Sequence, residues 1–294
     1  MSVFVQQNGS ECDFPNSDAW VVLSPIEQSI KRKIEAVGTP LKDWDINIYR
    51  GVLTGCNEAF IISAEKRNEI LANCMTEDER ARTAELIRPI LRGRDIKRYG
   101  YDWAGLYLIN THNGIKGKLE RIHIEDYPAV KAHLDQYWDK ISTRADKGDT
   151  PYNLRNCAYL EDFNKPKIMY PNMTKYLPFY YDERNYFQND KSFMITGSNV
   201  SFLAAFLNSS LFKFCFRDCF PELLGGTREL RKIFFDKIPV ILVTDKINAQ
   251  FKKAVNDIQV GYSKSKAQAI DEMIFDLYKL SDKERQLIGF VEIE

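Results

Sequence analysis

Three separated stretches of the sequence are rich in the side chains that bind phosphate groups and base edges. The first is RPILRGRDIKRYGYDW, in which a glycine permits a turn among arginines and lysines. The second, residues 152–176, mixes lysines with tyrosines, and the third, GGTRELRK, brings a threonine and cations to an expected helix start. Arginine offers a planar fork of donors to phosphate or guanine, and backbone amides at a helix start can hold a phosphate. The candidate nucleic-acid contacts are Arg92, Arg94, Lys97, Arg98, Arg155, Lys165, Lys167, Lys175, Tyr176, Thr227, Arg228 and Arg231.

Each stretch also has an ordinary structural interpretation. Cations at a helix C-terminus complement its dipole, a solvated sheet face over a tyrosine core would look like residues 152–176, and Thr227 could simply cap a helix. The 41 basic and 41 acidic residues give a net charge of zero, which argues against a strong non-specific nucleic-acid binder. A nucleic-acid function therefore requires the three stretches to fold onto one face.

Motifs for catalysis are missing from the sequence. His112, His123 and His133 share no metal-ligand spacing, and neither a GxSxG nor an HExxH motif occurs. GIKGK, residues 114–118, lacks the spacing of a phosphate-binding loop and reads as a solvated turn. There is no Gly-rich turn for S-adenosylmethionine and no Asn/Asp-Pro-Pro-Tyr/Phe loop. We therefore expect no catalytic site, cofactor or metal in this chain.

Composition is that of an ordinary globular protein, with 44% hydrophobic and 28% charged residues. The six cysteines form no CxxC pair, so we expect reduced thiols and a cytoplasmic protein. No apolar run is long enough to cross a membrane, and the N-terminus lacks the pattern of a signal peptide.

Helix caps and alternating apolar residues predict an α+β fold of short strands and capped helices. Capping boxes at Ser24 and Thr76 begin two helices, the first over 24–37 and the second with Leu86, Ile87, Ile90 and Leu91 on its buried side. Strands are expected at about 46–48, 59–62 and 104–109, and in the strings PKIMYP, LPFYYD and KSFMIT, with a helix from 126–128 to about 141 and a buried helix over 199–214. The tail is helical, with an amphipathic stripe of Ile270, Met273, Ile274, Leu277 and Tyr278.

Four strings occur in an order that resembles the TaqI-like C-terminal specificity domain over about residues 20–240: INIYRGVLTGCNEAFII, LIRPILRGRDIKRYGYDWAGLYLI, LEDFNKPKIMYPNMTK and GGTRELRKIFFDKIPV. That domain is the target-recognition part of type IIG restriction–modification enzymes and related adenine methyltransferases. The resemblance implies recognition of double-stranded DNA by this chain. It also implies that a separate methyltransferase portion, sometimes with a nuclease, binds S-adenosylmethionine and does the chemistry.

The expected division is an irregular lead-in at 1–22, a DNA target-recognition domain at 23–240 and a helical segment at 241–294. Two other functions stay open from the sequence. The chain could be a protein-interaction or assembly module that uses the amphipathic stripe at 265–280, or a self-contained small-molecule transferase or hydrolase.

Overall fold

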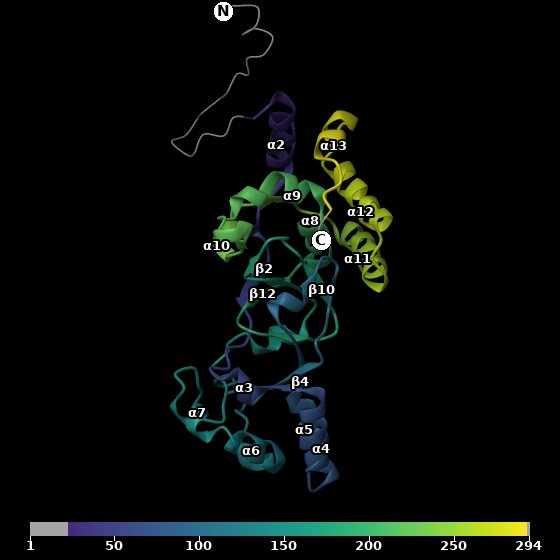
Figure 1. Cartoon of the computed structure of the whole chain (residues 1–294). Helices are drawn as coiled ribbons and strands as arrows, with labels where there is room; N and C mark the ends of the chain where they lie inside the picture. The colour runs from purple at the N-terminus through teal and green to yellow at the C-terminus, as the bar shows by residue number, and fades with distance from the viewer. Residues whose placement is uncertain (1–22, 293–294) are drawn as a thin grey trace, which may run out of the picture.

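A computed structural model describes residues 23–292 and shows an elongated molecule with helices at both ends of a central β region (Figure 1). The expected lead-in at 1–22 lies outside the described residues. The helices are α2 (Pro25–Val37), α3 (Asn57–Phe60), α4 (Ala64–Ala72), α5 (Glu77–Leu86), α6 (Pro128–Asp135), α7 (Trp138–Thr143), α8 (Val200–Asn208), α9 (Ser210–Phe216), α10 (Lys232–Phe235), α11 (Asp245–Val260), α12 (Lys264–Leu277) and α13 (Asp282–Ile288). The strands are β1 (Gly38–Pro40), β2 (Ile46–Arg50), β3 (Ile61–Ser63), β4 (Ile87–Leu91), β5 (Ile96–Lys97), β6 (Gly100–Tyr101), β7 (Leu106–Ile109), β8 (Lys167–Pro171), β9 (Met173–Thr174), β10 (Tyr180–Asp182), β11 (Phe187–Gln188), β12 (Ser192–Gly197), β13 (Arg228–Glu229) and β14 (Pro239–Ile241). This mixture confirms the expected α+β class.

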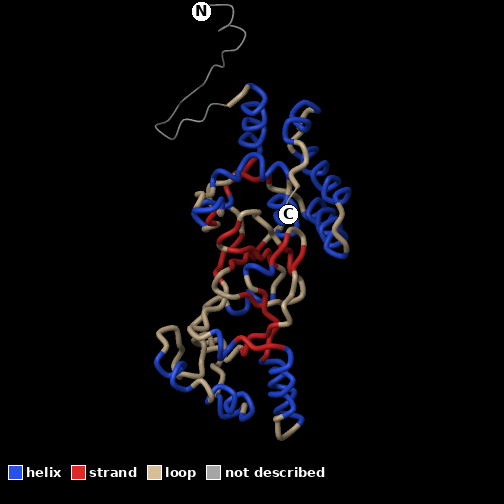
Figure 2. Tube along the Cα trace, in the orientation of Figure 1, coloured by secondary structure: helices blue, strands red, loops and turns tan. Residues whose placement is uncertain are grey.

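The strings PKIMYP, LPFYYD and KSFMIT form three neighbouring antiparallel strands, as predicted. With β2 they make a sheet in the order β10-β8-β12-β2. Ile168, Ile195 and Ile48 lie opposite one another across three of its strands and enter one core cluster, because alternate residues of a strand face the same side. The buried helix α8 packs against this face. The strands of the sheet are seen in the central red region of Figure 2.

A second sheet, in the order β11-β4-β7-β3, lies below the first in Figure 1. Strand β11 runs parallel to β4, and the chain then passes directly into β12 of the first sheet. The prediction of a strand over 59–62 was wrong in part: Ala59 and Phe60 belong to the helical turn α3, and only Ile61 and Ile62 enter β3. That strand pairs with β7 rather than with β2.

The prediction for the second capped helix needs a correction at its end. Thr76 caps α5 through its side chain, as expected, but the helix ends at Leu86 and residues 87–91 form β4. Pro89 explains the change, since proline has no N–H for a helix and disfavours helical geometry at Arg88 before it. The helix expected to 141 is likewise two helices, α6 and α7, and the one expected over 199–214 breaks at Ser209, which caps α9.

The amphipathic stripe of the tail packs inside the molecule. Ile270, Ile274 and Tyr278 are buried in the same cluster as α8 and the first sheet, together with Phe251 of α11. One core therefore extends across residue 240, and the functional division at that position stays a prediction.

No helix in residues 23–292 combines the length and apolar character needed to cross a membrane. Cys56, Cys74, Cys157, Cys215 and Cys219 are free thiols.

Candidate nucleic-acid interface

A surface groove of about 820 Å³ opens where five parts of the chain meet. Its walls come from residues 93–102, from 171–178 at the end of β8, from Lys191, from Thr227, and from 258–262 at the C-terminal end of α11. We call it the basic groove. It brings together members of all three cationic stretches found in the sequence, namely Arg94, Lys97, Arg98, Lys175, Tyr176 and Thr227.

A tight turn after β4 presents Arg94 to solvent. Arg92 holds the turn closed: its backbone N–H and its Nε both donate to Asp95 Oδ2, at 2.8 and 2.9 Å, and its Nη2 donates to Oδ1 at 2.7 Å. Hydrogen bonding to Asp95 raises the pKa of Arg92. A Cβ on Gly93 would lie 2.8 Å from the carbonyl oxygen of Lys191, so glycine lets the turn press against the start of β12. Arg92 therefore positions the turn, and Arg94 is the exposed cation that it carries.

The next two cations of this stretch differ in their surroundings. Lys97 lies at the bend of the β5–β6 hairpin, where it is exposed and 3.5 Å from Asp102. Arg98 is only 8% exposed and donates to the carbonyl oxygens of Asn208 at 2.7 Å and Val291 at 3.0 Å. The Arg98 guanidinium joins this hairpin to α8 and to Val291, and its contact with DNA stays a prediction.

The second stretch contributes Lys175 and Tyr176, both exposed beside β9 at the end of β8. The backbone holds this segment between the other walls: Asn172 N–H donates to the carbonyl oxygen of Lys191 at 2.9 Å, and its own carbonyl accepts from Leu230 at 2.8 Å.

Lys167, another of the predicted DNA contacts, is buried in the structure. Its side chain is 0% exposed and donates to Asp182 at 2.5 Å and to the Phe163 carbonyl at 2.6 Å. Burial lowers the pKa of Lys167, and the neighbouring carboxylate acts in the opposite direction. The sheet face that carries Lys167 is covered by the rest of the fold, so this lysine cannot contact a duplex in this structure.

Arg155 and Lys165 are exposed but lie outside the basic groove. Arg155 pairs with Asp146 at 2.9 Å and Lys165 with Asp162 at 2.8 Å. Their side chains belong to a different part of the surface, beside the stacked rings of Tyr49 and Tyr159.

The third stretch also has both exposed and buried side chains. Thr227 lines the basic groove, and its hydroxyl donates to the Leu224 carbonyl at 3.1 Å. Arg228 is buried, donates to the Phe220 carbonyl at 2.7 Å and pairs with Glu222 and Asp218. Its guanidinium is thus engaged within the chain, and its contact with DNA stays a prediction. Arg231 is exposed, pairs with Glu229 at 2.8 Å and lies outside the basic groove.

Lys191 is a groove cation that the sequence reasoning missed. It is 73% exposed and lies 3.4 Å from Asp190, which also pairs with Arg50. As the first residue of the string KSFMIT, it could have been indicated by its place immediately before β12, because this antiparallel neighbour starts at the edge where β8 ends. Around the basic groove the exposed cations are Arg94, Lys97, Lys175 and Lys191, and among the described lining residues Asp102 is the one carboxylate. A chain without net charge thus carries one locally positive surface.

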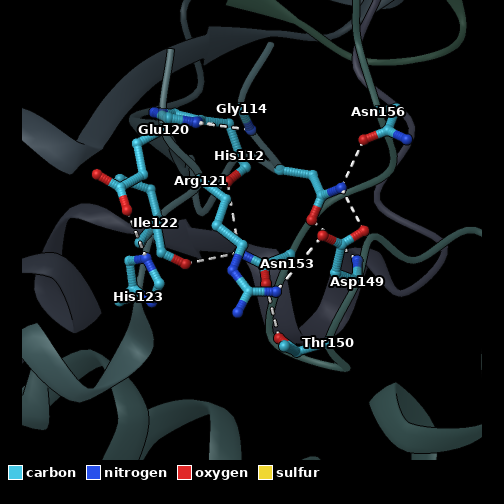
Figure 3. Close-up of polar contacts among 11 residues, drawn as sticks. His112, Gly114, Glu120, Arg121, Ile122, His123, Asp149, Thr150, Asn153 and Asn156 are labelled. Carbon is cyan, nitrogen blue, oxygen red and sulfur yellow. Dashed lines mark hydrogen bonds and ion pairs between the residues drawn. The ribbon is translucent and has the colours of Figure 1, made fainter. Parts of the chain in front are cut away.

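The Gly-rich loop near residue 114 is held by hydrogen bonds among neighbouring side chains and backbone groups (Figure 3). The Asn113 side chain donates to Asp149 at 2.9 Å and to Asn156 at 2.5 Å, and its oxygen accepts from the Asp149 N–H at 2.9 Å. His112 Nδ1 accepts the Gly114 N–H at 3.2 Å, and burial lowers the pKa of this histidine. These bonds fix the turn from within.

Two cations in and beside that loop are paired with carboxylates. Arg121 lies 3.4 Å from Asp149, and Lys118 pairs with Glu161. Within residues 23–292, no cluster of three or more His, Cys, Asp or Glu side chains could hold a metal ion. The basic groove is therefore the better candidate for a polyanion.

The family model of the TaqI-like C-terminal specificity domain matches residues 88–240, and the chain belongs to this family. Membership supports a role in DNA target recognition.

Two solved structures share the fold. The type IIG restriction endonuclease BpuSI has a TM-score of 0.51 at 15% identity, covering 87% of this chain and 33% of that one. The type IIL restriction–modification enzyme MmeI, solved in complex with DNA, has a TM-score of 0.56 at 12% identity, covering 85% and 35%. The chain thus spans about a third of the length of each. No curated protein sequence matches it.

Proposed function

We propose that the chain recognises a specific sequence in double-stranded DNA through the basic groove. The observation that carries this proposal is the meeting of Arg94, Lys97, Lys175 and Lys191, from three segments of the chain, around one groove whose lining residues include a single carboxylate, Asp102. Phosphate contacts by such cations fix the register of a duplex, while arginine and tyrosine side chains can reach base edges. Arg94 and Tyr176 are the side chains that we assign to the reading of bases.

We further propose that this recognition serves a separate catalytic portion, an adenine methyltransferase with or without a nuclease. That portion would bind S-adenosylmethionine, and it would lie on the same polypeptide or on a partner chain in the cytoplasm. The support is family membership together with the fact that the chain corresponds to about a third of each restriction enzyme of similar fold. The chain itself would hold the duplex while the partner acts on the adenine.

Selection from a randomised duplex library tests the first part. The wild-type chain should enrich one sequence, and binding to that duplex should exceed binding to scrambled DNA by about 10³-fold or more. Equal binding to all duplexes, or none, would contradict the proposal. Mixing the chain with a related methyltransferase portion and sequencing the methylated sites tests the second part, which predicts methylation beside the selected sequence.

The assembly function based on the amphipathic stripe has lost its support. Ile270, Ile274 and Tyr278 are buried within this chain and offer no face to a partner. A small-molecule transferase stays testable by titration with S-adenosylmethionine, for which we expect no binding to this chain alone.

A further inference from the structure

A narrow hairpin borders the basic groove and carries a fully exposed leucine at its tip. Residues 220–229, which we call the tip hairpin, run from buried Phe220 to strand β13. Leu224 is 99% exposed, more than any other large apolar side chain in residues 23–292. Singly exposed apolar side chains are common on protein surfaces, so it is the position of Leu224 beside the basic groove that marks it as a candidate contact.

The turn that carries Leu224 is held by hydrogen bonds within the tip hairpin. Leu223 N–H donates to the Thr227 carbonyl at 2.6 Å, and Gly226 N–H donates to the Leu223 carbonyl at 3.3 Å. Gly225 and Gly226 have φ angles of 78° and 76°, a left-handed conformation that side chains disfavour. Two successive glycines therefore permit this bend immediately after Leu224.

Arg228 fixes the base of the tip hairpin. Its guanidinium donates to the Phe220 carbonyl at 2.7 Å and pairs with Glu222 at 2.9 Å and Asp218 at 2.8 Å. The buried arginine thus anchors the hairpin and offsets the two carboxylates beside it. Its role is to position the tip rather than to touch a ligand.

The tip hairpin lies directly against the groove wall. Strand β13 pairs with β9, and Thr227 and Met173 both line the basic groove. A Cβ on Gly226 would lie 3.6 Å from Cε of Lys175, which places this groove cation beside the turn. The turn that carries Leu224 therefore lies at the margin of a surface with four exposed cations.

We propose that Leu224 is a wedge that inserts between adjacent base pairs of the bound duplex. This inference rests on the proposed DNA-recognition function. Apolar side chains on DNA-binding proteins partly unstack a base step in this way, and the cost is offset by the closer wrapping of the duplex. Charge complementarity favours DNA over an apolar protein partner, because the groove beside the tip would hold the phosphates that flank the distorted step.

The experiment compares Leu224→Ala with Leu224→Phe in the full chain. The probe is the duplex selected by the wild-type chain, labelled with end dyes for energy transfer and carrying 2-aminopurine at successive steps. Met75→Ala is the matched control, since Met75 is 86% exposed in the α4–α5 turn, at the far end of the molecule from the helical tail (Figure 1).

We expect Leu224→Ala to weaken binding about tenfold to fiftyfold, because three carbon groups lose their apolar contact. With the wild-type chain, an inserted wedge should raise 2-aminopurine fluorescence at the unstacked step and bend the duplex. Both signals should disappear with Leu224→Ala, whereas Leu224→Phe and Met75→Ala should retain them. The salt dependence should stay that of the wild-type chain, since no charge is removed.

Two failures are distinguishable. If Leu224→Ala keeps its affinity and the fluorescence rise while Arg94→Ala weakens binding, the wedge is refuted and the recognition function stands. Such a result would direct attention to an apolar pocket on a partner protein. If the wild-type chain enriches and binds no duplex, both proposals are refuted.

Discussion

Removing groove cations should change the salt dependence of DNA binding by an amount that the structure fixes. Each neutralised phosphate contributes about −0.9 to the slope of log K against log salt. With Arg94, Lys97, Lys175 and Lys191 engaged, the expected slope is about −3.6, which weakens binding about 150-fold between 50 and 200 mM salt. The double variant Arg94→Ala/Lys175→Ala should halve the slope to about −1.8 and reduce that loss to about tenfold.

Fluorescence anisotropy with the selected duplex at four or five salt concentrations measures these slopes. The matched control is Arg155→Ala/Lys165→Ala, which removes two cations that are also exposed but lie outside the basic groove. This control should retain the wild-type slope within about 0.5, well under the change for one contact. The reasoning is refuted if the control lowers the slope as much as the groove variant does. A groove variant with an unchanged slope would refute it equally.

Three further predictions concern the framework of the fold. Asp182→Ala should lower the free energy of unfolding, measured by urea titration, by about 3–5 kcal/mol, because it leaves the Lys167 ammonium buried and unpaired. The control Asp102→Ala, at an exposed ion pair, should lower it by less than about 1 kcal/mol in the same assay. Burial raises the pKa of Glu284, but hydrogen bonds from an ammonium and two hydroxyl-bearing residues outweigh it and bring the pKa down to about 2. The stability from this carboxylate is therefore present above about pH 4.5 and is lost between about pH 4.5 and 2, so unfolding curves of Glu284→Gln should depend less on pH in that range. Ile274→Ala should lower the free energy of unfolding by about 2–5 kcal/mol without changing the oligomeric state; lost self-association at wild-type stability would restore the assembly function.

Local sequence determined many of the helix boundaries and the strand content. Ser24 and Thr76 cap their helices as predicted, because a cap needs only a side-chain oxygen and an amide three residues away. The apolar spacing of residues 87–91 did not distinguish a strand from a helix, although Pro89 disfavours a helix there. Pairing with β7 decides the outcome.

Tertiary structure decided which cations are available to a ligand. Lys165 and Lys167 are two residues apart, a spacing that places strand residues on one face, yet one is exposed and the other is fully buried. The difference arises because Asp182, which pairs with Lys167, reaches it only through the β8–β10 pairing. Composition and spacing therefore located the cationic stretches, whereas the basic groove exists only because strand pairing brings Arg94, Lys175 and Lys191 to one edge of the fold.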